Sequence, residues 1–590
     1  MKSQLKKISV KEKINRNKNF IIFFIVSTLA LQSLIMNIVY EINFPYSVDW
    51  LGIYYLEDYI FKGEFPFEKL VEPHAGHYII FPRLFVLPNL LLNSFDISNL
   101  FYFQWAILSI SLFFIYLLLR KTEKSIYFIL IPIAAFIYNP LQTSNYWAFA
   151  ILLWLIPSLA VIMVIFLLNR EKIDSKIFSL AIVISIISTF SSIIGIVSWL
   201  AGIVSLIHFN SKKNLMDKKW LAGWIGTTIV IGTIYYSFVP KDTITIHFPL
   251  LLSEKGFNFI TTFVAAAFRL KFDFLMASVG GFSILLFIFC LYFFTVVKKK
   301  INLAWPWIIF ILVGISDAII TGAGRVQLDL HEGNEPYYIP MSHFTQIGLL
   351  VLLSLMIVDL RNSTLQRRNI LIAVLVAIII LQMILLIPSY YSGWWRAEYY
   401  FQEKSKHLEC FSLYHEDSCE AELSPLNQNL NIINFWLENK LSIFRTSELN
   451  QRNTDELKDF EKIWQNQKKI VNGNGQIETI NDLEVLQYES ISVKNPVLTI
   501  EGWFIDDNMS QVDSLYLIVD DKPFLKYTDF KPRIDIVEKF NLIDELRPGW
   551  RISFLSAYLV NECQKFSIVG LSGEKIITLE QQVQVCKNKD

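Results

Sequence analysis

The sequence predicts a polytopic α-helical membrane bundle of about eleven transmembrane helices, followed by a mixed helical linker and a small antiparallel β-sandwich. Three observations support this prediction. The hydrophobic fraction, 53%, is too high for an ordinary soluble protein. Apolar runs of roughly 20 residues, the length that crosses a bilayer core, recur up to about residue 390. Beyond about residue 485 apolar and polar residues alternate, as they do in strands.

The first apolar run, 19–42, follows a basic leader at 1–18. A cleaved signal peptide has a shorter apolar core that ends in small residues, so we expect a retained first helix. Further runs lie near 100–120, 126–139, 148–168, 177–193, 194–208, 220–239, 273–297, 303–323, 344–360 and 370–388.

Lysines and arginines cluster after alternate helices and so predict an orientation. The clusters are Arg120/Lys121/Lys124, Arg170/Lys172/Lys176, Lys212/Lys213/Lys218/Lys219, Lys298/Lys299/Lys300 and Arg361/Arg367/Arg368. Cytoplasmic loops are enriched in these residues, so the clusters and the N-terminus are predicted to face the cytoplasm of a bacterial-type inner membrane. The band 177–207 then forms two short helices that turn near Ser191, Ser192 and Gly195; one overlong helix is the alternative.

This orientation predicts that the soluble parts lie outside the cytoplasm. The outer segments are the 43–98, 240–272 and 324–343 loops and everything after 389. The expected domains are a transmembrane domain at 19–390, a helical linker region at 391–480 and a β-sandwich at 481–590.

Four cysteines lie in the tail that we place outside: Cys410, Cys419, Cys563 and Cys586. An even number of cysteines in an oxidising compartment suggests disulfides. The nearest pairings are Cys410–Cys419 and Cys563–Cys586, and the sequence leaves the connectivity open. Four free thiols in a cytoplasmic tail are the alternative.

The C-terminal strands are separated by Asp, Asn, Pro and Gly. Asp520-Asp521, between a strand and Pro523, suits a hairpin turn. This end resembles a bacterial β-sandwich module found on membrane proteins and surface glycosyltransferases, in which Trp503 is expected to be a core residue. The resemblance rests on Glu501-Gly502-Trp503-Phe504-Ile505-Asp506, Lys531-Pro532-Arg533-Ile534-Asp535-Ile536-Val537 and Pro548-Gly549-Trp550.

The first outer loop is the richest in groups that can do chemistry. Asp49 follows the first helix at the outer water boundary, where a carboxylate suits a general base; a helix cap is the alternative. Asp58 is a further acidic candidate in this loop. His74 and His77, three residues apart, could bind phosphate, a metal or a proton, or could be surface or packing residues.

Two later outer segments carry polar and aromatic groups. Asn145 and Trp147 could contact a sugar or form an interfacial turn. Arg325 emerges at a helix end, where a guanidinium can grip a phosphate; an ion pair with Asp329 or another loop carboxylate is the alternative. Tyr338 follows in the same loop. Arg269 could add positive charge near this loop; the alternative is that its side chain snorkels to the membrane interface.

Several function classes are disfavoured. With 53 basic and 53 acidic residues there is no net field to attract nucleic acid. No P-loop, GxGxxG, nucleophile elbow or HExxH is present, which disfavours ATP-driven pumps, Rossmann enzymes and zinc proteases.

The membrane part resembles the C-type (GT-C) glycosyltransferases over roughly residues 19–390. The matching pattern is Asp49-Trp50 after the first helix, a His-rich stretch closing on Phe81-Pro82-Arg83-Leu84, then Asn145-Tyr146-Trp147 and Gly324-Arg325. Two features depart from it. Glu72-Pro73-His74-Ala75-Gly76-His77 replaces an Asn-Glu-His-Arg-like stretch, and Glu335-Pro336-Tyr337-Tyr338 replaces a Ser-Arg-Tyr triplet, which loses a second arginine.

The resemblance implies inverting transfer of a sugar from a polyprenyl-phosphate carrier to an extracytoplasmic glycan, lipid or protein. Asp49 would be the base, and Arg83, Arg325 and His74 or His77 would neutralise the lipid phosphate. No cofactor is implied, with a divalent cation as the alternative. A transporter or flippase, a ligase or polymerase, and a silent scaffold are the other functions considered.

Overall fold

The structure is a computed structural model. It describes residues 2–40, 67–73, 77–92, 96–143, 149, 151–170, 172–210, 215–238, 248–327, 333, 335–363, 366–409, 457, 460–464, 470–485, 490–493, 497–528, 530–543, 546–555, 563–573 and 575–587. The chain divides into two compact units near Phe401, a helical unit and a β-rich unit, and each is described by itself.

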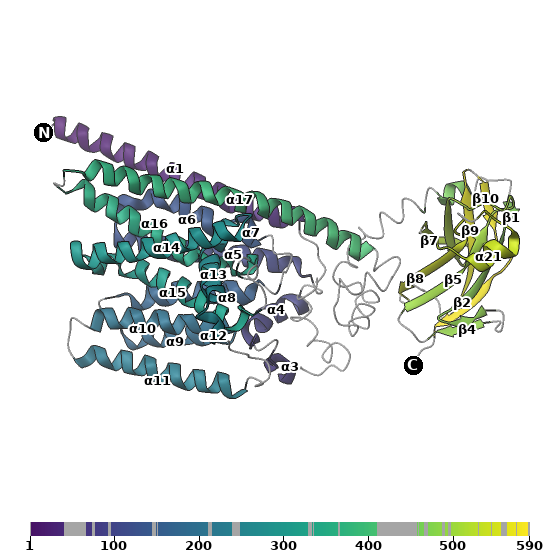
Figure 1. Ribbon diagram of the computed structural model, residues 1–590, viewed down its shortest axis with the longest axis horizontal. Helices are drawn as coiled ribbons and strands as arrows, with labels where there is room; N and C mark the ends of the chain where they lie inside the picture. The colour runs from purple at the N-terminus through teal and green to yellow at the C-terminus, as the bar shows by residue number, and fades with distance from the viewer. Residues whose placement is uncertain are drawn as a thin grey trace. The chain divides into compact units, whose positions relative to one another are not determined.

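The helical unit contains long, closely packed helices (Figure 1). The principal ones are α1 (Lys2–Tyr40), α3 (Phe67–Val71), α4 (Ile80–Leu92), α5 (Ser98–Thr122), α6 (Leu130–Ile137), α7 (Pro140–Thr143), α8 (Leu152–Leu168), α9 (Ser175–Thr189), α10 (Val197–Asn210), α11 (Leu215–Phe238), α12 (Phe248–Leu251), α13 (Glu254–Ala265), α14 (Asp273–Tyr292), α15 (Ile301–Arg325), α16 (Ile339–Arg361) and α17 (Arg368–Glu409). Short turns η4 (Ile193–Ile196), η6 (Ala266–Phe268) and η9 (Pro336–Tyr338) connect them.

Each predicted apolar run forms a helix, but the expected number of spans is not confirmed. Among the described residues, seven helices are long and apolar enough to cross a membrane, which identifies a multi-pass membrane protein. They are Lys18–Tyr40, Ser98–Thr122, Ser125–Gln142, Asp273–Val297, Ile301–Arg325, Pro336–Arg361 and Arg368–Gln402. The helices α8, α9 and α10 have 17, 15 and 14 residues, and α11 is diluted by Gly, Thr and Tyr. At about 1.5 Å per residue the three short helices fall below a bilayer core of about 30 Å.

The predicted pair of helices over 177–207 is present. The chain breaks after Thr189 and resumes through η4 into α10. Gly195 makes the close reversal possible, because a Cβ there would lie 1.9 Å from the Ser188 carbonyl oxygen. The Ser188 hydroxyl donates to the Gly195 carbonyl at 3.1 Å and so fastens the turn.

The basic clusters lie at one end of the bundle, which we call the basic end. The Lys121 ammonium and the Arg170 guanidinium approach the Phe166 ring at 4.1 and 5.0 Å, which joins the ends of α5 and α8. The Trp307 indole donates to the Thr122 hydroxyl at 3.1 Å, so the start of α15 lies beside the end of α5.

Two further contacts bring the remaining clusters to the same end. The rings of Phe178 and Trp220 lie 4.6 Å apart, joining the starts of α9 and α11. Lys298 and Lys300 both pair with Asp359, at 2.7 and 2.5 Å, joining the end of α14 to the end of α16. The described members of all five clusters therefore share one end, as the orientation argument requires.

The first helix runs antiparallel to α5. The Trp105 indole donates to the Ala30 carbonyl at 2.9 Å, and the Asn37 amide donates to the Phe101 carbonyl at 3.2 Å. The basic leader thus begins at the basic end, whereas α17 starts there and leaves at the opposite end. We call that opposite end the far end; α9 ends there at Thr189, α15 ends there at Arg325 and α16 begins there at Ile339.

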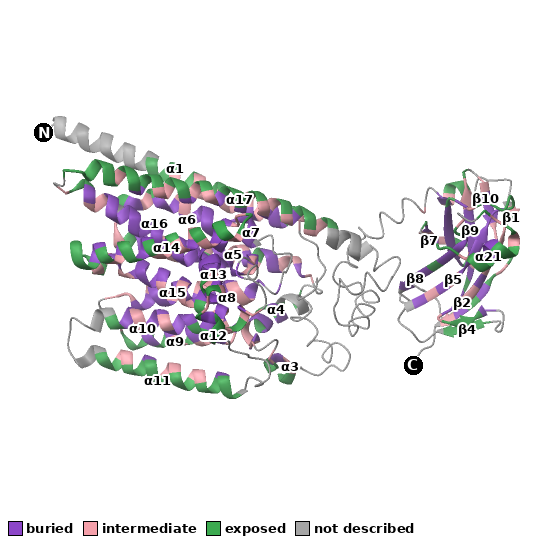
Figure 2. Ribbon diagram, viewed as in Figure 1, coloured by how far each residue is buried: buried purple, intermediate pink, exposed green. Residues whose placement is uncertain are grey.

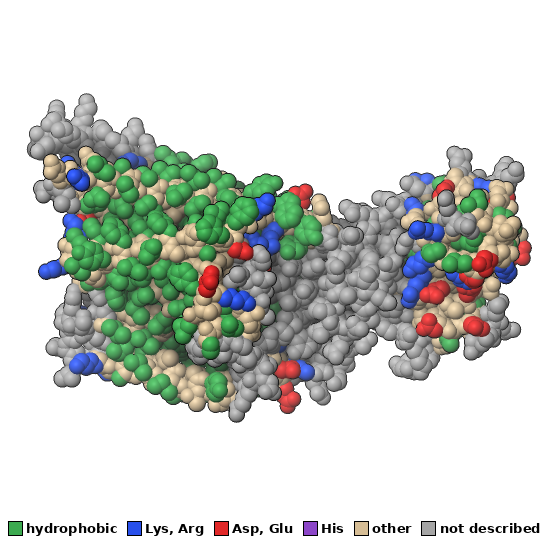
Figure 3. All heavy atoms as spheres, viewed as in Figure 1, with side chains coloured by type: hydrophobic (Ala, Val, Ile, Leu, Met, Phe, Trp, Pro, Cys, Tyr) green, Lys and Arg blue, Asp and Glu red, His purple; other side chains and the backbone are tan. Residues whose placement is uncertain are grey.

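Burial identifies α16 as the central helix. In its apolar window 94% of the residues are buried, against 17% for α1 and α17 (Figure 2). Hydrophobic side chains cover the outer face of the bundle between its ends (Figure 3). Large apolar side chains such as those of Phe20, Leu285 and Ile387 are exposed on the surface of the helical unit, as expected where side chains contact lipid.

The β-rich unit is a two-sheet sandwich in which the smaller sheet is antiparallel, as predicted, and the larger sheet is mixed. Its strands are β1 (Ile470–Asn472), β2 (Asn474–Ile480), β3 (Leu483–Glu484), β4 (Ser490–Val493), β5 (Val497–Ile505), β6 (Ser514–Val519), β7 (Lys522–Tyr527), β8 (Gly549–Leu555), β9 (Cys563–Ser572), β10 (Lys575–Thr578) and β11 (Val583–Lys587). One sheet has the order β3-β2-β5-β8. The other contains β1-β10-β9-β11-β4, with β6 paired to β9 and β7 paired to β6. The β1–β10 and β11–β4 pairs are parallel, and the first strand starts at Ile470, before the expected boundary.

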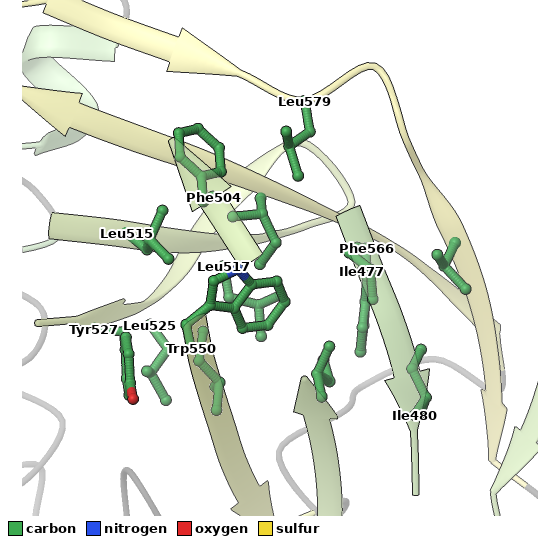
Figure 4. Packing of buried hydrophobic residues seen from close by; sticks show 14 of the residues in the cluster. Ile477, Ile480, Phe504, Leu515, Leu517, Leu525, Tyr527, Trp550, Phe566 and Leu579 are labelled. Atoms are coloured by element: carbon green, nitrogen blue, oxygen red, sulfur yellow. The ribbon is translucent and has the colours of Figure 1, made fainter. Parts of the chain in front are cut away.

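The two sheets enclose one apolar core. Ile477 and Phe504 from the smaller sheet face Leu517 and Phe566 from the larger one (Figure 4). The outer face of the smaller sheet is covered by α21 (Ile534–Phe540). Trp503 lies there, 6% exposed, and packs against α21, so it is a core residue as the sequence predicts.

Two covalent and local predictions are confirmed. Cys563 and Cys586 form a disulfide between the paired strands β9 and β11, whereas Cys410 and Cys419 lie outside the described residues. Asp520 and Asp521 form the β6–β7 hairpin turn with φ of 47° and 61°. Positive φ at both central positions is what a two-residue turn of type I′ requires.

The module motif consists of packing residues. A Cβ on Gly502 would lie 2.0 Å from the Gln476 carbonyl oxygen and 2.7 Å from the Trp550 ring, so only glycine lets that ring lie flat on β5. Arg533 pairs with Glu478 at 2.5 Å and with Asp535 at 2.6 Å, and these hydrogen bonds raise the pKa of the guanidinium. The motif thus joins α21 to the smaller sheet.

Gly502→Ala is expected to destabilise the β-rich unit by about 2–4 kcal/mol, because a backbone carbonyl cannot move aside as a side chain would. Chemical denaturation followed by tryptophan fluorescence measures the effect. Gly573→Asn is the matched control, since Gly573 has φ of 59° and open space around it, where asparagine fits. Equal stability of the two variants would contradict this account of the motif.

Candidate functional site

The far end holds the described residues that the sequence singled out for chemistry. His77 and Arg83 lie on the segment that packs on α9 and α11, and Arg325 and Tyr338 lie where α15 ends and α16 begins. The others, Asp49, Asp58, His74, Asn145 and Trp147, lie outside the described residues, so their predicted roles stay predictions.

Arg83 is fully buried and caps a helix. Its Nη1 donates to the carbonyls of Lys69, Leu70 and Glu72 at 2.7, 3.1 and 2.8 Å. These carbonyls lie at and just beyond the end of the short helix α3, where few backbone donors remain and a cation is favoured. Arg83 therefore joins α4 to the end of α3. Its predicted contact with phosphate stays a prediction.

Aromatic contacts anchor the same segment beside His77. The backbone N–H of Tyr78 donates to the Tyr235 hydroxyl at 3.4 Å, and the two rings meet edge to face at 5.2 Å. The Phe190 ring lies 6.0 Å from Tyr78, and the Phe81 N–H donates to the Phe190 carbonyl at 3.3 Å. Burial raises the pKa of the Tyr78 phenol, which stays neutral.

Arg325 and Tyr338 belong to a different side of the far end. Arg325 is half-buried at the end of α15, and the nearby Gln327 carbonyl accepts from the Lys255 ammonium of α13 at 3.3 Å. Tyr338 is buried and packs on the Phe263 ring at 5.1 Å. Tyr338 is thus fixed at the start of α16 rather than free in a loop.

A pair of arginines lies close to Tyr338. Arg269 follows η6 with φ of 47°, an unusual conformation for a residue with a Cβ. The pKa of the Arg269 guanidinium is lowered. Burial is the main cause and the neighbouring guanidinium of Arg396 adds to it, while Glu335, Tyr400 and Asp273 act in the opposite direction. Two like charges in partly dry surroundings favour an anionic ligand, which can take the place of Glu335 or Asp273 beside Arg269.

Hydrogen bonds of the Asn139 side chain explain why the two arginines lie near each other. The Asn139 amide donates to the Ala267 carbonyl at 3.3 Å and to the Ser389 hydroxyl at 2.7 Å, which fixes η6 against α17. Arg269 is two residues after Ala267, and Arg396 is two helical turns after Ser389 on the same face. These hydrogen bonds bring Arg396 of α17 near Arg269.

A layer of buried polar side chains lies inside the bundle, next to the far end. The Gln346 amide donates to the Val264 carbonyl at 3.0 Å and to the Ser283 hydroxyl at 3.3 Å, and accepts from Gln382 at 3.2 Å. One turn closer to the far end, His343 is 2% exposed against the Phe136 ring, with centroids 5.6 Å apart. The sequence placed His343 in a loop, but it lies inside α16.

No metal centre is found among the described residues, since no group of three or more His, Cys, Asp or Glu there could hold an ion. Comparisons with protein-family models, with curated proteins and with solved structures found no match to the chain. The fold and site define a multi-pass membrane protein with an appended β-sandwich.

Arg83→Met is expected to loosen the end of α3, because three buried carbonyls lose a charged donor. At about 2 kcal/mol the local opening constant should rise roughly 30-fold. Hydrogen exchange of peptides covering 67–73 measures it. Glu68→Gln, an exposed change on the same helix, should leave the exchange unaltered; an unchanged rate in Arg83→Met would remove the capping role.

Proposed function

We propose that the chain is a membrane glycosyltransferase that moves a sugar from a polyprenyl-phosphate donor to an acceptor outside the cytoplasm. Asp49 acts as the general base and takes the proton of the acceptor hydroxyl as that oxygen attacks the anomeric carbon. The anomeric bond to the lipid phosphate breaks on the opposite face, so the reaction inverts the configuration.

The observation that carries the proposal is the arginine pair at the far end. The guanidinium groups of Arg269 and Arg396 lie close enough to interact electrostatically, and Arg325 ends its helix at the same end of the bundle. Guanidinium groups match the geometry of phosphate oxygens, and a leaving phosphate gains negative charge as the bond breaks. The basic clusters at the opposite end support an extracytoplasmic far end under the positive-inside rule.

The first test compares envelope glycans, by mass spectrometry, from strains that lack the gene or carry Asp49→Asn. We expect both to lose the same single sugar unit, because loss of a general base lowers the rate about 10²–10⁴-fold. Full transfer by Asp49→Asn would remove Asp49 from the mechanism.

The second test measures binding of polyprenyl phosphate to the full-length protein in nanodiscs by native mass spectrometry. Arg269→Gln and Arg396→Gln should each weaken binding about tenfold, the value of one charged hydrogen bond. Arg361→Gln, an arginine change at the basic end, is the matched control. Equal binding by all three variants would overturn the phosphate site while leaving the Asp49 test intact.

A carrier of lipid-linked glycans is the second candidate, because Asp317 and His343 are ionisable groups buried within membrane-spanning helices. The first test separates the two candidates. A flippase would leave the intact lipid-linked glycan on the cytoplasmic face of the mutant strain, whereas a transferase would leave the acceptor one sugar short.

A further inference from the structure

Asp317 is a carboxyl group without a partner in the interior of the bundle. Its residue is 0% exposed, and neither carboxylate oxygen meets a hydrogen-bond donor in the part of the chain that the structure describes. It is the sole acidic residue of α15. It lies eight residues before Arg325, about 12 Å along the helix from the far end.

The helix spacing places this carboxyl between α15 and α16. Gly314 faces α16, because a Cβ there would lie 2.4 Å from the Thr345 hydroxyl oxygen. Asp317, three residues later, shares that side of the helix, and helical side chains lean back toward the preceding turn. Asp317 and Thr345 are therefore expected on the facing sides of α15 and α16 near Gly314, and no hydrogen bond joins them in the structure.

The Thr345 hydroxyl also lacks a partner among the described residues, and so does the Thr321 hydroxyl one turn after Asp317. A hydroxyl can accept a hydrogen bond from a neutral acid, but it cannot balance a buried negative charge. The constellation therefore fits the protonated carboxyl.

No described cation is placed to neutralise Asp317. The helices packed most extensively on α15 are α16, α13 and α10. Of the elements with smaller contacts, α12, η4 and η7 (Phe293–Val297) contain no titratable residue, and the basic residues of α5, Arg120 and Lys121, lie at the basic end. On α16, His343 is turned to the opposite side, against Phe136. On α13, Glu254 and Lys255 lie at the helix start, where Lys255 donates to the Gln327 carbonyl, and the described side chains of α10 contain no titratable group.

We propose that Asp317 is a proton-binding site inside the bundle, held as the neutral acid between α15 and α16 on the side of α15 that faces Thr345. Its ligand is a proton rather than a metal cation, because one carboxyl and two hydroxyls supply too few oxygens for the six or so that a hard cation takes. The site does not depend on the proposed transferase activity. It gives the chain a group that can take up or release a proton within the membrane-spanning part.

Infrared difference spectroscopy on the full-length protein in nanodiscs tests the proposal. We expect the carbonyl stretch of a protonated carboxylic acid at neutral pH, its shift to lower frequency in D2O, and its loss in Asp317→Asn. Asp359→Asn is the matched control, because Asp359 pairs with Lys298 and Lys300 and is ionised. That variant should keep the band.

Thr345→Val keeps the shape of the side chain and removes a polar hydroxyl from the surroundings of the carboxyl, so the band should move to higher frequency. This variant keeps the test decisive if Asp317→Asn does not accumulate. Absence of a band that depends on Asp317 overturns the neutral acid. A band that does not respond to D2O overturns an exchangeable proton site, and one unmoved in Thr345→Val overturns the placement beside Thr345.

Discussion

The low polarity of the bilayer is the constraint on which the helical unit depends. Each spanning helix satisfies its backbone internally and turns apolar side chains outward, so charged groups collect at the two ends. The contacts of Phe166 and Asp359 with basic side chains show how closely the charges gather at the basic end. The far end is the other place where polar groups are tolerated, and it therefore holds the candidate chemistry.

Small residues set how closely the elements approach within that constraint. Gly195 allows α9 and α10 to reverse, and Gly314 and Gly348 let α15 and α16 lie against one another. In the β-rich unit Gly502 plays the same part, because the Trp550 ring rests where a side chain would stand. A glycine at such a position determines the distance between neighbours, which in turn determines what can be buried between them.

The sequence predicted helix positions well, since a run of apolar residues is a local property. The predicted number of about eleven spans is not confirmed, because length and hydropathy decide crossing, and α8 to α10 are short. The parallel pairing of Ile470 with Ile576 joins residues about a hundred positions apart, and no local period encodes that pairing. The hairpin at Asp520-Asp521 was predictable because the turn is local.

The candidate site was predictable only in part, for the same reason. Arg325 and Tyr338 were recognisable in the sequence as polar groups at helix ends. Arg396 was not, because it lies among aromatic residues such as Trp394 and Trp395. Its approach to Arg269 depends on Asn139, which joins two elements far apart in the sequence. Asp317 carried a signal that the sequence did contain: one acidic residue in a helix of 25 that is otherwise apolar up to its last turn. A helix can bury such a residue without a cation only if the carboxyl keeps its proton. The interior of the bundle around Asp317 therefore differs chemically from the far end, where Arg269 and Arg325 lie.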